Sequence, residues 1–433
     1  MDILVLGNDG RAYSLGKRLV MEGHKVSFMP GNSACSFLGE TFDVPPAFTL
    51  KNSVRSLLVT GGGVDLVVGT ALDTSENKMV DYFREYVPVY GVPKTGVRLE
   101  ADRGYASEVC ERVGIKTPAF KVGTVDEAIK HVQEQQKPFV VKWDSLVGGT
   151  NVTVCESMED TIHELERRKT KQVMLQERLY GVEVSFMVSI VGENCDAVGL
   201  CTVFEHKRAY NGDMGPMTAE MGSLVLAGVS SKGMELFEKL RPELQAIGYQ
   251  GLLDINCIMD TQTGELGFIE FTARFGDPTT EIVLPMIKSD VGELLRAWAI
   301  GEPIKPEFKH ACGVGVVIAG GGYPFPMQVE QGVPILLDDQ WYEHIDFMSA
   351  QLQSVDPIRA YTKGGRQLIA LGHGSSVQEA QRKAYSNALK VRFRDMYYRT
   401  DIGDKWHRGE KQLCVMHGIV EDGLGGFNQW ELR

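Results

Sequence analysis

Short apolar runs alternate with helical periods through the first part of the chain. Unbroken apolar runs that alternate with helices are typical of the buried strands of a parallel sheet. Tyr13–Glu22 has the helical period that such a pattern requires between two strands. We therefore predict a Rossmann-like parallel-sheet domain over residues 1–97. Its expected strands are Ile3–Leu6, Lys25–Met29, Val64–Val68 and Val87–Tyr90.

A glycine-bearing turn joins the first of these strands to the first helix. It reads Gly7-Asn8-Asp9-Gly10-Arg11. The backbone N–H groups of such a turn and the positive end of the helix can bind an anion. The glycine spacing is not the full dinucleotide fingerprint, so a phosphate ester is a better candidate than a nicotinamide cofactor.

The middle of the chain predicts helices and then a hairpin. Apolar residues recur at helical spacing in Leu99–Val113 and Lys121–Val132. The strands Pro138–Lys142 and Val152–Val154 flank the glycine loop 148–151. Such a loop beside a strand-end lysine can close over a triphosphate, and a plain hairpin is the alternative. The next expected strands are Val173–Glu177 and Glu183–Met187.

The segment Phe268–Pro278 predicts an apolar strand that carries two charged side chains. Glu270 and Arg274 are four residues apart, and an even spacing on a strand places both on one face. A carboxylate can bind a hard divalent cation, and an arginine can bind phosphate oxygens in a bidentate way. The segment therefore predicts a site for a metal ion and the phosphates that it bridges. The alternative is an ordinary ion pair on a strand.

The last part of the chain predicts a third region. Residues 310–324 and 331–399 suggest short strands, and Val377–Val391 has the helical period. The final segment, 404–433, shows no pattern that assigns it a role.

Composition narrows the class of function. The 433 residues correspond to about three domains, and a hydrophobic content of 43% is enough for packed cores. The formal net charge of -12 argues against nucleic acid bound through a general basic surface. The eight cysteines include no CxxC pair, and no apolar run has membrane-spanning length. We expect a cytoplasmic protein that acts on small molecules and binds neither nucleic acid nor membrane.

Several motifs occur in the order known from one enzyme family. They are His206–Asp213, Gly215-Pro216, Met221-Gly222, Arg274–Pro278, Lys288–Asp290, Gly321–Pro324, Gly364–Arg366 and Tyr397–Gly403. With these motifs the chain resembles the ATP-grasp ligases and, within them, the glycinamide ribonucleotide synthetase (phosphoribosylamine–glycine ligase) family. The resemblance covers residues 1 to about 403.

The resemblance implies an α/β protein with an ATP-grasp fold. The Rossmann-like substrate-binding domain would be followed by an ATP-grasp domain at 98–305, whose flexible subdomain spans about 116–185. An α+β closing domain would occupy 306–403, and residues 404–433 would form a tail extension.

The resemblance also implies a two-stage reaction that needs ATP and Mg²⁺ (or Mn²⁺). Glycine carboxylate would attack the γ-phosphate, and the amine of 5-phosphoribosylamine would capture the acyl phosphate. Positioning and charge neutralisation dominate such chemistry, so no covalent nucleophile is required. Two alternatives stay open: a ligase for another amino acid and amine, and a nucleotide-binding relative without turnover. The enzyme would be a monomer or small homo-oligomer.

The resemblance assigns roles to individual residues. ATP would be bound by Arg103, Lys142, Glu177, Leu179 and Glu183, with the phosphates at Lys142, the adenine at Glu177 and Leu179, and the ribose at Glu183. Arg274, Asp277 and Lys207 would be catalytic. Glu270 would hold the metal with Thr272, and Asp254 is our own candidate for a second metal carboxylate because it lies on the preceding strand. A buried aspartate paired with a neighbouring base is the alternative for Asp254. The phosphoribosyl substrate would bind at Gly7, Asn8, Gly10, Arg11, Asn32 and Asp213.

The chain departs from the family pattern at substrate and phosphate contacts. Ala12 and Tyr13 replace Glu and His, and Thr150 replaces the lysine of the flexible loop. Thr272 stands where a metal-binding Asn is expected. Glu220 adds a carboxylate near the acyl site, where it would repel glycine's carboxylate or attract a cationic substrate.

Overall fold

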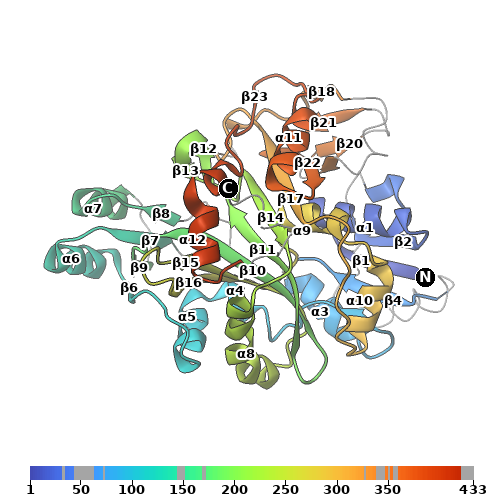
Figure 1. The fold of residues 1–433 in the computed structure, drawn as a ribbon, viewed down its shortest axis with the longest axis horizontal. Helices are drawn as coiled ribbons and strands as arrows, with labels where there is room; N and C mark the ends of the chain where they lie inside the picture. The colour runs from blue at the N-terminus through green and yellow to red at the C-terminus, as the bar shows by residue number, and fades with distance from the viewer. Residues whose placement is uncertain are drawn as a thin grey trace.

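The structure is a computed structural model, and its described residues form an α/β protein, as predicted (Figure 1). It describes residues 1–31, 35–42, 63–71, 74–143, 152–167, 172–325, 328–337, 347–349, 352–354 and 359–420. The strands of these residues form five sheets.

The N-terminal sheet is parallel and has the order β3-β2-β1-β4-β5, which is the Rossmann-like arrangement expected from the sequence. Helix α1 begins at Gly10, before the predicted Tyr13, because the Asp9 side chain accepts hydrogen bonds from the backbone N–H groups of Arg11 and Ala12. The elements are β1 (Asp2–Gly7), α1 (Gly10–Met21), β2 (Lys25–Pro30), β3 (Glu40–Thr41), β4 (Leu66–Gly69), α3 (Thr74–Phe83) and β5 (Val89–Tyr90).

The predicted helix over Leu99–Val113 is two helices, α4 (Arg98–Ala101) and α5 (Arg103–Arg112). Asp102 separates them with an extended backbone, and its side chain caps α5 by accepting a hydrogen bond from the Tyr105 N–H. A helical period cannot reveal this break, because one non-helical residue leaves the apolar spacing nearly unchanged.

A four-stranded antiparallel sheet of order β6-β9-β7-β8 follows. The predicted hairpin strands are β7 and β8, and the loop 148–151 lies outside the described residues. The predicted helix from Lys121 starts later, because Thr124 and Glu127 form a capping box in front of α6. The elements are β6 (Phe120–Gly123), α6 (Val125–Gln135), β7 (Phe139–Trp143), β8 (Val152–Val154), α7 (Met158–Arg167) and β9 (Val173–Glu177).

The largest sheet is antiparallel and runs β16-β15-β10-β11-β14-β17-β22-β19, with β23 pairing to β17. It continues across residue 305, where the sequence suggested a boundary, and β17 and β22 are nine-residue strands where short strands were expected. Its strands are β10 (Val182–Val191), β11 (Asp196–Glu205), β14 (Gly222–Ala227), β15 (Gly251–Met259), β16 (Leu266–Thr272), β17 (Cys312–Gly320), β19 (Phe347–Ser349), β22 (Arg366–Gly374) and β23 (Met396–Tyr397).

The two smaller sheets pair β12 with β13 and arrange β18, β21 and β20 side by side. The remaining elements are α8 (Ser231–Ala246), α9 (Thr279–Val283), α10 (Val291–Ala299), α11 (Val377–Ala388), α12 (Lys411–Met416), β12 (Arg208–Tyr210), β13 (Met214–Met217), β18 (Pro334–Ile335), β20 (Leu352–Ser354) and β21 (Ala360–Thr362).

Both faces of the largest sheet are buried, in two separate cores. On β10, Phe186 and Val188 belong to one core and Met187 to the other, because successive side chains of a strand point to opposite faces. Helices α5, α8 and α11 contribute to the first core, and α1 and α10 to the second. The second core also contains Val5 of β1, so it joins the N-terminal sheet to the largest sheet.

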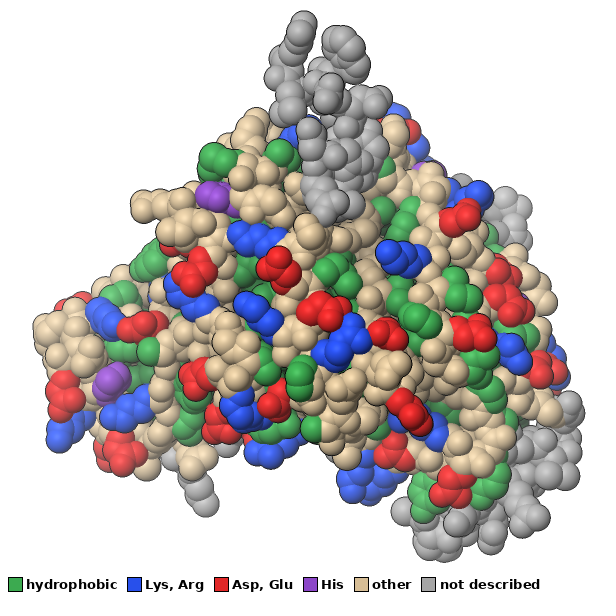
Figure 2. Space-filling model, turned by 60° about the horizontal axis from the view of Figure 1, so that its bottom comes forward, with side chains coloured by type: hydrophobic (Ala, Val, Ile, Leu, Met, Phe, Trp, Pro, Cys, Tyr) green, Lys and Arg blue, Asp and Glu red, His purple; other side chains and the backbone are tan. Residues whose placement is uncertain are grey.

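Charged side chains lie at the surface, and the cysteines lie in the interior. Figure 2 shows acidic and basic side chains interspersed on the face in view. The eight cysteines are buried thiols without disulfides. In the described part of the chain, no helix has both the length and the apolar character needed to cross a membrane.

His373 generates a prediction about acid stability. Burial lowers its pKa to about 4, and its ring lies 3.0 Å from the Ile282 carbonyl. The unfolded chain binds a proton near pH 6.5 and the folded protein does not, so His373 destabilises the fold as the pH falls below 6.5. The cost is about 2 kcal/mol at pH 5. We expect His373→Gln to flatten the fall in unfolding free energy between pH 7 and 5, measured by urea denaturation. The matched control is His163→Gln at an exposed position, and equal slopes in both variants would contradict the prediction.

Candidate active site

One lysine lies among three carboxylates at the end of the central strands. The Lys207 Nζ atom is 2.9 Å from Glu205, 3.1 Å from Glu183 and 3.3 Å from Glu270. Glu183 is the second residue of β10 and Glu205 ends the neighbouring antiparallel strand β11, so both lie at the same end of the sheet. Although burial opposes the charge, the three carboxylates raise the pKa of Lys207 well above its usual value.

Two further cations approach Glu270. Lys142 on β7 is 4% exposed, and its Nζ lies 3.5 Å from the Ile269 carbonyl. Arg103 on α5 is 3.8 Å from the Glu270 carboxylate. Burial lowers the pKa of Lys142 to about 7, with Arg103 adding to the effect and Glu270 opposing it. Although burial opposes it, Lys207, Arg103 and Lys142 lower the pKa of Glu270 to about 2.

These contacts place the site between two sheets. Lys142 belongs to the four-stranded sheet, and Glu270 belongs to the largest sheet. Cations can neutralise the charge of a triphosphate, and an ionised carboxylate can hold the metal ion that the triphosphate carries. The structure therefore brings together the predicted residues Lys142, Arg103, Lys207 and Glu270.

The predicted metal residues supply oxygen donors on adjacent strands. Asp254 on β15 pairs in register with Thr272 on β16, and Asn256 pairs with Glu270. Asp254 is 2% exposed and its Oδ1 atom has no hydrogen-bond partner. Carboxylate and hydroxyl oxygens are suitable ligands for Mg²⁺, so this donor set fits the ion.

These donors do not form a closed cage. Within the described ranges, the one group of three candidate ligand atoms that lie within 4.8 Å of one another is Glu22, His24 and Asp290. His24 is 2.9 Å from Asp290, and Glu22 accepts hydrogen bonds from Arg18 and the Val291 N–H, so these side chains join α1 to α10. An open donor set at Glu270 suits an ion that takes most of its ligands from phosphates and water.

The expectation that Glu270 and Arg274 share one face of a strand is wrong. Strand β16 ends at Thr272, and a register shift interrupts its pairing with β15. Arg274 lies beyond the strand and donates from Nε to the Glu100 carboxylate at 2.9 Å. Glu270 instead pairs with Lys207 and Arg103.

The loop 274–277 is tied to three distant parts of the chain. Glu100 of α4 binds the Arg274 guanidinium and the Ala273 N–H. Arg11 donates to the Phe275 carbonyl at 3.2 Å, which connects the loop to the first turn. Arg366 of β22 pairs with Asp277 at 2.8 Å. The expected catalytic residues Arg274 and Asp277 therefore lie against the expected substrate turn.

The first turn, residues 7–11, requires a glycine at position 7. A Cβ atom at Gly7 would lie 2.2 Å from the Thr70 Oγ1 atom, so a side chain cannot fit there. Gly10 is the buried first residue of α1, Asn8 is exposed, and Asn32 lies outside the described residues. The N-terminus of α1, which the Asp9 side chain caps, lies next to the loop that contains Asp277, because Arg11 donates to the Phe275 carbonyl.

Three predicted residues have partners outside the lysine cluster. Glu177 forms an ion pair with Lys137 and is 42% exposed. The Leu179 side chain packs on β16, where a Cβ atom at Gly267 would lie 2.6 Å from it. Asp213 pairs with the buried Arg399 at 2.9 Å and with Lys405.

His206, which opens the predicted motif, is not part of a solvated cationic stretch. It is 2% exposed, and the Gly403 N–H donates to its ring at 3.4 Å. Burial lowers the pKa of His206 to about 3, so the ring is neutral near pH 7. The buried His206 ring anchors the chain directly after β11, and Lys207 is the next residue.

Glu220, the carboxyl group expected near the acyl site, is buried. It is 6% exposed and hydrogen bonds to Ser223. Burial and the charge of Glu205 raise its pKa well above the usual value. Burial thus opposes the negative charge on which the expected repulsion of a glycine carboxylate depends.

Sequence reasoning missed four residues of this region, namely Glu100, Glu205, Glu281 and Arg366. Glu205 directly precedes the His206 motif, and Arg366 ends the quoted motif Gly364–Arg366, so adjacency was a usable signal for both. Glu281 on α9 is fully buried, and neither of its carboxylate oxygens has a hydrogen-bond partner. Burial and the charge of Asp277 raise the pKa of Glu281 well above its usual value.

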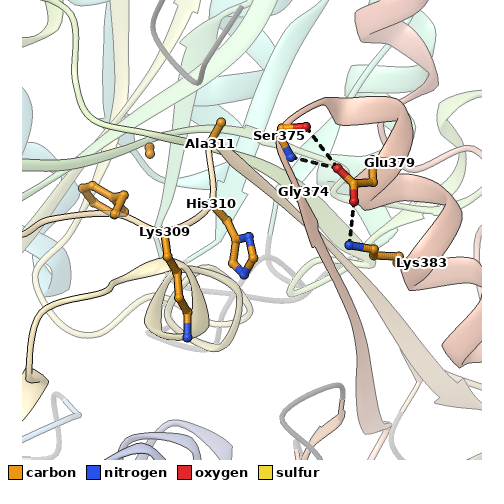
Figure 3. A pocket seen from close by; sticks show the side chains of 9 residues that line it. Lys309, His310, Ala311, Gly374, Ser375, Glu379 and Lys383 are labelled. Carbon is orange, nitrogen blue, oxygen red and sulfur yellow. Dashed lines mark hydrogen bonds and ion pairs between the residues drawn. The ribbon is translucent and has the colours of Figure 1, made fainter.

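A separate hollow lies between α11 and the end of β17 (Figure 3). It has a volume of about 600 Å³ and is lined in part by Lys309, His310 and Lys383. Glu379 in this hollow already accepts from the Ser375 N–H at 3.0 Å and pairs with Lys383 at 2.7 Å. None of the predicted site residues lines it.

Comparison with known proteins places this geometry in a family. The ATP-grasp (A) domain model of phosphoribosylglycinamide synthetase matches residues 101–280, and the C domain model matches residues 313–405. The phosphoribosylamine–glycine ligase of Thermotoga maritima is 30% identical over 92% of this chain and 98% of the relative. The same ligase of Halalkalibacterium halodurans is 29% identical over 94% of this chain and 97% of the relative.

The crystal structure of the Thermotoga maritima ligase also matches the fold. Its TM-score is 0.76 at 29% identity, over 93% of this chain and all of that structure. The ATP-grasp fold expected from the resemblance is confirmed.

Removing the Lys207 charge tests its structural importance. Lys207→Met leaves three neighbouring carboxylates without their shared counter-ion. We expect a loss of about 2 to 4 kcal/mol in unfolding free energy at pH 8, toward the lower end of the roughly 3 to 5 kcal/mol that a broken, fully buried pair costs. The reduction arises because Glu183 and Glu270 are 32% and 34% exposed. Urea denaturation measures this loss, and Lys288→Met, which removes an exposed pair with Glu307, should change stability by less than about 1 kcal/mol. Equal losses in both variants would contradict the prediction.

Glu281 predicts a pH-dependent stabilisation. An acid whose pKa is higher in the folded than in the unfolded state destabilises the fold increasingly as the pH rises above about 4.3. Glu281→Gln removes this ionisation and offers an amide donor to a region in which the Asp277 Oδ1 atom also lacks a partner. We expect the variant to raise Tm more at pH 8 than at pH 5. Glu302→Gln at an exposed position is the control, and a Tm difference that does not change with pH would refute the prediction.

Proposed function

Because the chain belongs to the phosphoribosylglycinamide synthetase family of ATP-grasp ligases, we propose that it joins glycine to 5-phosphoribosylamine in purine biosynthesis. The products are glycinamide ribonucleotide, ADP and phosphate. The observation that carries the proposal is the cation cluster of Lys142, Arg103 and Lys207 around Glu270, between two sheets. Phosphoryl transfer depends on such positioning and charge neutralisation.

In this proposal ATP lies between the four-stranded sheet and the largest sheet. Lys142 and Arg103 bind its phosphates, and Glu183 accepts hydrogen bonds from the ribose. Glu177 and the Leu179 backbone bind the adenine at the end of β9. A bound triphosphate would favour the charged form of Lys142, whose pKa of about 7 reflects burial among other cations.

We propose that Glu270 and Asp254 hold Mg²⁺, with Thr272 beside them. The orphan Oδ1 atom of Asp254 and the ionised state of Glu270 support this assignment. Held by these residues, the ion would supply positive charge that offsets the charge of the phosphates during transfer. Lys207, which pairs with Glu270, would hold this carboxylate in position for the ion.

The chemistry proceeds in two displacements. A glycine carboxylate oxygen bonds to the γ-phosphorus, and the bond from that phosphorus to ADP breaks. The amine nitrogen of phosphoribosylamine then bonds to the acyl carbon, phosphate leaves with the electron pair of the carbon–oxygen bond, and the nitrogen releases a proton to water. Arg274 would bind the transferring phosphoryl group, and Asp277 would shape the substrate end.

The first turn is the proposed site of the phosphoribosyl phosphate. Gly7, Gly10 and Arg11 place the N-terminus of α1 next to the loop 274–277. Helix N-termini favour phosphate, and here a phosphate would compete with the Asp9 carboxylate for the Arg11 and Ala12 N–H groups. This arrangement would bring the amine of the sugar substrate to the acyl phosphate.

The domain assignment follows the same proposal. Residues 1–97 would bind the sugar phosphate, 98–305 would bind ATP, and 306–403 would close the site. The substrates are small molecules, and we propose the cytoplasm as the compartment.

ADP release tests the proposed function. The assay contains ATP and Mg²⁺, with glycine alone, phosphoribosylamine alone, or both together. We expect sustained turnover only with both substrates, because the acyl phosphate requires amine capture. Absence of turnover with both substrates, or turnover with another amino acid and amine in their place, would overturn the assignment.

Glu270→Gln tests the central carboxylate in the same assay. We expect kcat to fall by at least about 100-fold, because the variant removes the charge that holds the metal and organises three cations. Glu235→Gln, at an exposed position on α8, should retain wild-type kcat. Circular dichroism of both variants separates loss of catalysis from loss of folding, and an active, folded Glu270→Gln variant would refute the metal assignment.

A further inference from the structure

The hollow beside α11 lies apart from the proposed active site (Figure 3). Its volume of about 600 Å³ falls within the range of roughly 300 to 1,000 Å³ that small-molecule sites occupy. Its walls come from the segment 308–311 in front of β17, from the turn that follows β22, and from one side of α11. A molecule bound there would occupy a second site, separate from the Lys207 cluster.

Backbone hydrogen bonds and ring stacking fix the walls of this hollow. The Lys309 N–H donates to the Met286 carbonyl at 2.9 Å, and the Ala311 N–H donates to the Gly374 carbonyl at 3.1 Å. The His310 ring stacks on the ring of His373, with 5.7 Å between the two ring centroids. The fold thus sets the shape of the hollow, which lowers the cost of ordering its walls around a ligand.

The charges that line the hollow are mainly positive. Figure 3 shows the His310 ring between the side chains of Lys309 and Lys383. Glu379 is the carboxylate among the described residues of the lining, and both of its oxygens have partners: one pairs with Lys383 at 2.7 Å, and the other accepts from the Ser375 N–H at 3.0 Å. The hollow is therefore a positive site on a protein whose formal net charge is -12.

Several donors of the hollow are available to a ligand. In the part of the chain that the structure describes, no hydrogen bond or ion pair engages the side chain of Lys309 or that of His310. Lys383 uses two of its three donors, on Glu379 and on the His373 carbonyl at 2.9 Å. These donors lie on two walls of one space, an arrangement that suits an anion with several acceptor oxygens.

We propose that this hollow binds the phosphate group of a small phosphate ester, up to the size of a nucleotide. Lys309 and Lys383 would donate to its oxygens from two walls, and the His310 ring would donate between them. The inference goes beyond the proposed function, because none of the residues assigned to ATP, the metal or the substrates lines the hollow. The ester would be bound there without being converted.

The ionisation of His310 provides a local readout of binding. Burial lowers its pKa, the charges of Lys309 and Lys383 lower it further, and Glu379 opposes this effect. A bound phosphate favours the charged ring and would raise the pKa of His310. The chain has nine histidines, so NMR of isotope-labelled histidine can follow this ring, and His310→Gln identifies its signal.

Titration of the full-length protein tests the site. The probes are inorganic phosphate and AMP, with succinate as a dicarboxylate and adenosine as the uncharged counterpart of AMP. We expect phosphate and AMP to shift the His310 signal saturably and to raise the pKa of His310. Adenosine should cause neither change, and succinate should bind at least about tenfold more weakly, because phosphate concentrates its charge on three oxygens of one group.

Variants of Lys309 test the contact directly. We expect Lys309→Met to weaken AMP binding roughly tenfold, at the lower end for a hydrogen bond to a charged group because Lys309 is exposed. Lys309→Arg keeps the charge and should retain most of the affinity. The matched control is Lys305→Met, at an exposed position of the same connection to β17, which should leave the Kd for AMP unchanged.

Three results would overturn the assignment. They are a His310 signal that responds to neither phosphate nor AMP, an unchanged Kd for AMP in Lys309→Met, and a response to adenosine or succinate as strong as the response to AMP. Failure of the proposed ligase function would leave the expected results unaltered, because the His310 signal reports the hollow and not the site at Glu270.

Discussion

The ammonium group of Lys207 is the constraint on which the catalytic region depends. It is the counter-ion that Glu183, Glu205 and Glu270 share, and these carboxylates come from three strands of the largest sheet. Taking such charges partly out of water is costly, and the cost is offset only when geometry and counter-charge are both correct. The cluster thus fixes how the ends of β10, β11 and β16 lie relative to one another. Lys142 and Arg103 then approach Glu270 from other elements, which adds two cations to the cluster at the position proposed for the phosphates of ATP.

The loop 274–277 connects the Lys207 cluster to the proposed substrate site. The loop 274–277 contacts the first turn through Arg11, α4 through Glu100 and β22 through Arg366. These partners lie up to 264 residues away in the chain. Because each contact involves a guanidinium group, the loop is fixed by directional, charge-assisted hydrogen bonds as well as by packing. The three parts of the molecule therefore meet at the position where the acyl phosphate would encounter the amine.

The largest sheet explains why these parts form one unit. Its strands continue across the expected boundary near residue 305, and both of its faces are buried. The N-terminal sheet shares a core with it through α1 and α10, and the C-terminal segment joins the opposite core through Trp406. The segment 404–420, to which the sequence assigned no role, is consequently positioned by the same burial of apolar surface that positions the catalytic strands.

Local patterns in the sequence determined the N-terminal parallel sheet and the hairpin of β7 and β8, and the family resemblance pointed to Lys142, Lys207 and Glu270, which the structure brings together. Apolar periodicity reports such elements directly, because it reflects which side of each strand or helix is buried. The tertiary structure alone decided the ionic partners: Glu100 for Arg274, Arg366 for Asp277, and Glu205 for Lys207. Periodicity could not supply these pairs, since it fixes the side on which a residue lies and contains no information about the element packed opposite. Glu270 and Arg274 also lie apart because β16 ends at Thr272 and its pairing with β15 shifts register. These two features depend on the neighbouring strand, so periodicity could not predict them.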